Sequence, residues 1–124
     1  METALLQSIY LQSRRSIRSI DRLQRRGAEG AMQLQREEYA QIAREAARLL
    51  TERGQPLPRQ QLLPLPYPLG NAPFNRRRQD SLRDLNRRVR SVAQMQVADP
   101  KVAALNRRLL LACHADATAM RSTF

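Results

Sequence analysis

The chain has 124 residues, a net charge of +11 and a single cysteine. Its basic side chains are 21 arginines and one lysine, against 11 carboxylates. One cysteine excludes an intramolecular disulfide, and no run approaches the roughly 20 apolar residues of a membrane-spanning helix. The charge favours a polyanion or an acidic protein surface as partner. Arginine suits either, because its planar guanidinium binds carboxylate or phosphate through two parallel hydrogen bonds.

The apolar composition argues against a large core. The chain has no Trp and only two Phe, and many of its apolar residues are Ala. High net charge with low mean hydropathy also places the free chain near the disordered class. We therefore predict an all-α, elongated protein with little independent core, built from a few long helices that pack against a partner.

Residues 3–53 have the apolar spacing of a helix. We therefore predict a first unit over residues 1–54, which is one long amphipathic helix or a pair of helices. The repeat changes register from a first to a second set of residues. Gly27 and Gly30 mark the expected bend or break, because each glycine weakens a helix by about 1 kcal/mol. One bent helix and two separate helices both fit. Gly54 and Pro56 predict the helix end. The first set is Leu6, Tyr10, Ile17, Ile20, Ala31 and Leu34, and the second is Ile42, Ala46 and Leu49.

The N-terminal stretch Leu5–Leu23 is amphipathic, rich in Arg and Ser, and poor in acids. This profile overlaps with that of a mitochondrial transit peptide, so a mitochondrial location stays open. A basic helix on an anionic membrane surface would use the same stretch, but Trp and Phe anchors are absent from its apolar face.

Residues 55–78 form a second unit that cannot be helical, because six of the seven prolines fall between Gln55 and Asn75. Leucines and aromatic residues alternate with these prolines, which a plain spacer does not require. We predict an extended arm that lies on a partner's surface. A solvated linker and a Pro-rich ligand for a small recognition domain are the alternatives.

Residues 79–124 predict a two-helix hairpin. Its first helix begins near Asp80 and presents a narrow apolar seam at Leu82, Leu85, Val89 and Val92. Asp99 and Pro100 are a typical helix start, with Asp as N-cap and Pro in the first helical position. The apolar residues of the second helix are Val102, Leu105, Leu109, Ala112, Cys113 and Met120.

No sequence motif indicates catalysis. There is no Gly-rich phosphate loop, nucleophile motif or metal-ligand spacing, and the chain has one histidine. His114 and Cys113 are adjacent, and adjacent helical side chains point about 100° apart, so they do not form a metal pair. We expect a non-enzymatic protein with no catalytic, cofactor or metal site, and Cys113 as a small core residue.

Two arginine runs are the predicted partner-binding sites. The first follows one face of the N-terminal helix, and the second places seven arginines in fifteen residues. Apolar residues of the arm would add buried contact area. The predicted partner-binding residues are Arg14, Arg15, Arg18, Arg22, Arg25, Arg76, Arg77, Arg78, Arg83, Arg87, Arg88, Arg90, Leu65, Tyr67, Leu69 and Phe74.

About twenty residues around Leu34–Tyr39 and Arg44–Gly54 resemble a pattern of small microtubule inner proteins of ciliary doublets. In that pattern an acidic-aromatic helical turn leads to a leucine, a glycine that ends the helix and an apolar residue, which Leu57 supplies here. Tyr39 lies about a heptad farther from the glycine than in the family pattern. The resemblance implies a short non-enzymatic protein whose helices and extended arms lie on acidic tubulin.

These observations predict a non-catalytic structural subunit of a large assembly, with an axonemal, microtubule-bound protein as the leading hypothesis. Its location would be the cytoplasm, in the axoneme of a cilium or flagellum. The partner would be tubulin or neighbouring subunits. An RNA-contacting accessory protein of a ribosome, or a mitochondrial complex subunit, is the alternative, because phosphates could replace carboxylates opposite the same arginines.

Overall fold

The computed structural model describes residues 2–25, 32–59, 83, 87 and 99–123. Three helices account for most of them: α1 (Glu2–Arg25), α2 (Gln33–Glu52) and α4 (Pro100–Thr123). No strand occurs among these residues, which confirms the predicted all-α class. None of the helices in the described ranges is long and apolar enough to cross a membrane.

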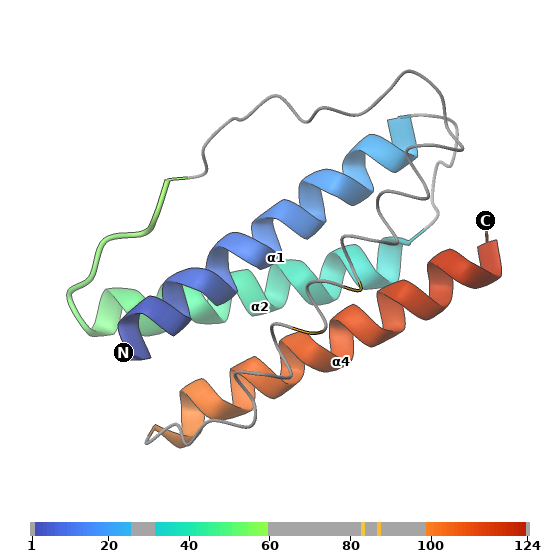
Figure 1. The fold of residues 1–124 in the computed structure, drawn as a ribbon. Coiled ribbons are helices and arrows are strands. Elements are labelled where there is room, and N and C mark those ends of the chain that lie inside the picture. The colour runs from blue at the N-terminus through green and yellow to red at the C-terminus, as the bar shows by residue number, and fades with distance from the viewer. Residues whose placement is uncertain (1, 26–31, 60–82, 84–86, 88–98, 124) are drawn as a thin grey trace.

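The three helices lie side by side, with α1 and α4 running in one direction and α2 in the other (Figure 1). Both α1 and α4 pack against α2, and they also touch each other. The apolar pattern of the first unit, residues 1–54, therefore belongs to two antiparallel helices, α1 and α2. This was one of the two arrangements that the sequence allowed.

A shared core lies between the three helices. Its largest fully buried side chains include Tyr39 and Ile42 from α2, Leu6 from α1, and Leu109 and Met120 from α4. Every apolar residue predicted for the final helix is buried. The expectation of little independent core is wrong for the described residues, because buried apolar side chains of α1, α2 and α4 form one continuous cluster.

Leu34 is a second correction. The apolar repeat placed it with the buried residues, yet its side chain is 77% exposed. Two turns later Ile42 and Ala46 are fully buried, as predicted. Leu34 lies in the first turn of α2, where the buried face is set by Met32 before the helix and Tyr39 within it.

Both helix boundaries predicted from Gly54 and Asp99 are confirmed. Gly54 has φ 67°, its N–H donates to the Thr51 carbonyl at 3.0 Å, and the Gln55 N–H donates to the Leu50 carbonyl at 2.9 Å. These two bonds are a Schellman motif. At the start of α4, Asp99 Oδ1 accepts the Lys101 N–H at 2.8 Å, as an N-cap does.

Ion pairs join the helices at their edges. Arg36 of α2 donates to both carboxylate oxygens of Asp21 in α1, at 2.6 and 3.3 Å. Arg108 of α4 binds Glu38 of α2 in the same two-pronged way, at 2.5 and 3.2 Å. Arg53, at the end of α2, pairs with Asp99. Each pair joins residues of two different helices or of their ends.

A buried polar contact crosses the core. The Tyr39 hydroxyl donates to Asp116 Oδ2 at 2.7 Å, and both side chains are fully buried. Cys113 Sγ lies 3.8 Å from the same hydroxyl oxygen. The predicted placement of Cys113 as a small core residue is confirmed, since it is fully buried and not in a disulfide.

Candidate partner-binding surface

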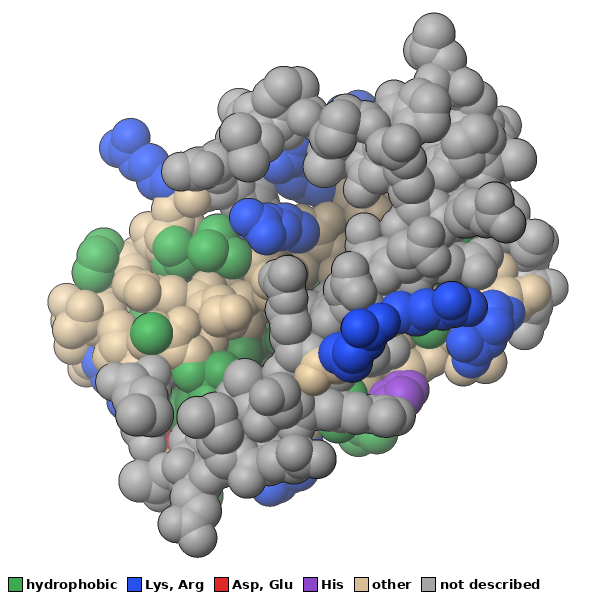
Figure 2. All heavy atoms as spheres, in the orientation of Figure 1, with side chains coloured by type: hydrophobic (Ala, Val, Ile, Leu, Met, Phe, Trp, Pro, Cys, Tyr) green, Lys and Arg blue, Asp and Glu red, His purple; other side chains and the backbone are tan. Residues whose placement is uncertain are grey.

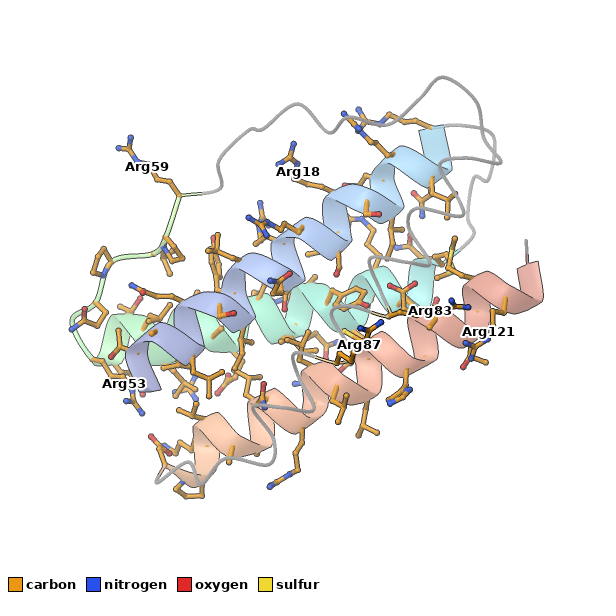
Figure 3. The ribbon with its side chains drawn as sticks, viewed as in Figure 1. Arg18, Arg53, Arg59, Arg83, Arg87 and Arg121 are labelled. Carbon is orange, nitrogen blue, oxygen red and sulfur yellow. The ribbon has the colours of Figure 1, made fainter. Side chains whose placement is uncertain are left out.

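Five arginines of α1 form one surface of the molecule, which we call the α1 arginine face: Arg14, Arg15, Arg18, Arg22 and Arg25. At 3.6 residues per turn, all five fall within a sector of about 100° around the helix, and they extend along about 16 Å of its axis. Arg14, Arg15 and Arg25 are exposed and the other two are half-buried. Arg18 extends from the side of α1 that faces away from α2 (Figure 3).

The opposite side of α1 positions this face. Leu6, Ile9, Ile17, Ile20 and Leu23 are buried, and their helical positions centre roughly 180° from the arginines. Burial of these residues therefore fixes the rotation of α1 about its axis. The arginine backbone positions are consequently fixed on a regular helix, although each long side chain keeps its rotamer freedom.

Most carboxylates of the described residues are already used within the chain. Asp21, Glu38 and Asp99 pair between elements. Glu45 and Glu52 both pair with Arg48. Among the described residues, no carboxylate lies within ion-pair distance of Arg14, Arg15, Arg18 or Arg25. The internal ion pairs thus leave these four arginines without a carboxylate partner among the described residues.

The internal pairs shift the ionisation of their members. The pKa of Glu45 is lowered, chiefly by the hydrogen bond from the Arg48 guanidinium, and partial burial opposes this. The pKa values of Arg36, Arg48 and Arg108 are raised, in each case first by the hydrogen bond to the partner carboxylate. These arginines therefore carry their full charge at every physiological pH.

A second group of basic side chains lies along α4. Arg107 and Arg121 are exposed on α4, and Arg83 and Arg87, which precede it in the chain, are exposed as well. Arg83, Arg87 and Arg121 all lie over α4 (Figure 3). Figure 2 shows a row of Lys and Arg side chains on this face of the molecule, with the histidine beside it.

The structure describes seven of the sixteen predicted partner-binding residues. It brings five of them together on α1 and places Arg83 and Arg87 over α4, separate from α1. The other nine, which are the remaining arginines of the second run and the four apolar residues of the arm, lie outside the described residues. So do the arm beyond Arg59, the predicted break at Gly27 and Gly30, and most of the first helix of the hairpin.

The sequence did not single out three residues of α4 that the structure describes: Arg107, Arg121 and Asp116. Arg107 and Arg121 are exposed and were not among the predicted partner-binding residues, although their separation of fourteen places them near the same side of a helix. Buried Asp116 was missed as well, because an acid on an apolar face gives no sign of a tyrosine partner 77 positions away. No group of three or more His, Cys, Asp or Glu that could hold a metal ion occurs in the described part of the chain.

Comparisons with known proteins give no assignment: no family model, curated protein or solved structure matches this chain.

Proposed function

We propose that this chain is a non-catalytic structural subunit of a large assembly that binds an acidic protein surface. The specific candidate is the tubulin of a ciliary or flagellar doublet microtubule. The supporting observation is the α1 arginine face, a row of five arginines on a helix whose other side is buried. Four of these arginines have no carboxylate within ion-pair distance among the described residues.

The energetics of such a row favour many weak contacts over a few strong ones. An exposed ion pair contributes about 0 to 1 kcal/mol, because solvent screens it and both side chains lose rotamer freedom. Several pairs formed together give useful affinity, since the helix holds their backbone positions before binding. A repeating acidic lattice would fit this mode of binding better than one compact pocket.

RNA is the second candidate partner, because the same row could contact phosphates. The described aromatic residues do not support base recognition. Tyr39 is fully buried against Asp116, and Tyr10 is packed against the core. Recognition of single-stranded bases relies on exposed aromatic rings. This observation favours a protein partner over RNA.

A co-sedimentation experiment tests the proposal. The full chain is pelleted with stabilised microtubules and compared with two charge-matched variants. One removes three charges from the α1 arginine face (R14Q/R18Q/R25Q). The other removes three exposed charges elsewhere (R44Q/R59Q/K101Q).

At about 0.5 kcal/mol for each lost pair, the α1 variant should bind about tenfold more weakly. The control variant should lose much less. Equal losses in both variants would mean that only total charge matters and would overturn the assignment to α1.

A salt titration distinguishes the two partner classes. The wild-type chain is titrated with salt on microtubules and, in parallel, on structured RNA at the same charge concentration. Retention on microtubules at a salt concentration that releases RNA supports the proposal. The reverse order would replace it with the ribonucleoprotein alternative, because phosphate contacts give a steep dependence on salt.

A further inference from the structure

We infer that the α1 arginine face binds an extended acidic peptide segment of its partner, which runs along the helix. The inference rests on the proposed function for the acidic character of the partner and adds the conformation of the part that is bound. Three features carry it. They are the axial spacing of the arginines, the lack of an exposed apolar seam on α1, and the shortage of acids in the rest of the chain.

The arginines of α1 have nearly the spacing of side chains on one side of an extended peptide. Arg14, Arg18 and Arg22 are four residues apart, so successive members are about 6 Å apart along the helix axis, and Arg25 follows about 4.5 Å later. In an extended peptide, alternate side chains lie on the same side and are about 6.6 Å apart. Alternating acids can therefore follow this row without a bend in the bound segment.

A partner helix suits this face less well, because α1 offers it no apolar seam. Helices associate in water mainly through apolar side chains that recur every three to four residues. The exposed large hydrophobic residues of the described chain are Leu34, Leu57 and Leu111, and none belongs to α1. Leu11 falls within the sector of the arginines, but it is partly buried, and one residue does not make a seam. An extended acidic peptide needs none, because its carboxylates bind the guanidinium groups directly.

The chain does not supply such an acidic segment itself. Five carboxylates of the described residues pair with arginines outside the α1 arginine face, and Asp116 is buried against Tyr39. Beyond the described residues the sequence has three acids, Glu29, Asp80 and Asp84. The last two lie within the second arginine run, where basic residues outnumber them. The bound segment therefore belongs to another molecule.

Fluorescence anisotropy with two labelled peptides of equal charge tests the inference on the full chain. The extended probe has twelve residues of alternating Glu and Ser. The helical probe has six glutamates four residues apart on an alanine-rich peptide that a covalent staple holds helical. Binding is measured at low ionic strength, where exposed ion pairs are least screened.

The same measurement is made on two charge-matched variants, R14Q/R18Q/R25Q in the α1 arginine face and R44Q/R59Q/K101Q elsewhere, and circular dichroism checks that both keep their helices. Competition of the unlabelled extended probe with stabilised microtubules, in co-sedimentation, relates the peptide to the proposed partner.

We expect the wild type to bind the extended probe at least about fivefold more tightly than the helical probe. The R14Q/R18Q/R25Q variant should bind the extended probe about tenfold more weakly than the wild type, and the control variant should lose much less. Equal affinity for the two probes, equal losses in the two variants, or no binding of the extended probe would overturn the inference.

The microtubule arm separates the inference from the proposed function. Microtubule binding that the extended probe does not displace would overturn the inference and leave the proposed function standing. Binding of the extended probe by a protein that does not bind microtubules would support the acidic segment and overturn the choice of tubulin.

Discussion

Replacement of Tyr39 by Phe tests the contact that joins α2 to α4 inside the core. The substitution removes only the hydroxyl that donates to Asp116 Oδ2 at 2.7 Å. Because both residues are fully buried, water cannot replace the lost donor without opening the core. Leaving one partner of a buried hydrogen bond unsatisfied costs about 1 to 3 kcal/mol, and we expect Y39F to lower the free energy of unfolding by that amount.

Urea denaturation followed by circular dichroism measures this loss. With a slope of about 1.5 kcal/mol per molar urea, a loss of 2 kcal/mol moves the midpoint down by about 1.3 M. Tyr10 supplies the matched control, since it is only partly buried against the core and Y10F removes the same atom. Equal midpoints for Y39F and Y10F would refute the reasoning, because they would show that the buried hydrogen bond adds no stability.

Three further substitutions test other features of the fold. Ser13→Ala should raise the free energy of unfolding by about 1 to 2 kcal/mol in thermal or urea melts, because the Ser13 hydroxyl is buried without a hydrogen-bond partner; a destabilised variant would contradict this. Asp99→Ala should lose about 1 to 2 kcal/mol in the same melts, whereas Asp99→Asn keeps an N-cap side chain and removes the charge that pairs with Arg53, so equal losses would show that the cap contributes nothing. The pKa of Glu45 is lowered by folding, so its contribution is present above the unfolded-state value and is lost as pH falls through the folded-state value. Wild-type stability should therefore drop more between about pH 5 and about pH 3 than that of E45Q, and parallel pH profiles would exclude the effect.

Local signals in the sequence predicted the helix boundaries well. Gly54 and Asp99 act within a few residues of themselves, through a left-handed backbone conformation and an N-cap hydrogen bond. The apolar repeat of the last helix likewise predicted its buried side. The grouping of five arginines on one side of α1 followed from helical periodicity alone.

Features that depend on distant parts of the chain could not be predicted. Small residues such as Ser13 and Ser16 suit either an exposed or a buried position, and only the neighbouring helices decide that they are buried. Asp116 is buried because Tyr39 reaches it from another helix. The sequence likewise gave no means of assigning acids such as Glu38 to particular arginines, so it could not show which basic side chains are neutralised internally.

The ion pair between Arg53 and Asp99 has a topological consequence. It joins the end of α2 to the start of α4 across 46 positions of sequence, and both ends lie on the same side of the bundle (Figure 1). Residues 54–98 therefore leave and re-enter the three helices at one place, as an insertion in a hairpin does. The closure entropy of such a loop grows only with the logarithm of its length. A change in the length of this segment should accordingly cost little stability while α1, α2 and α4 keep their packing.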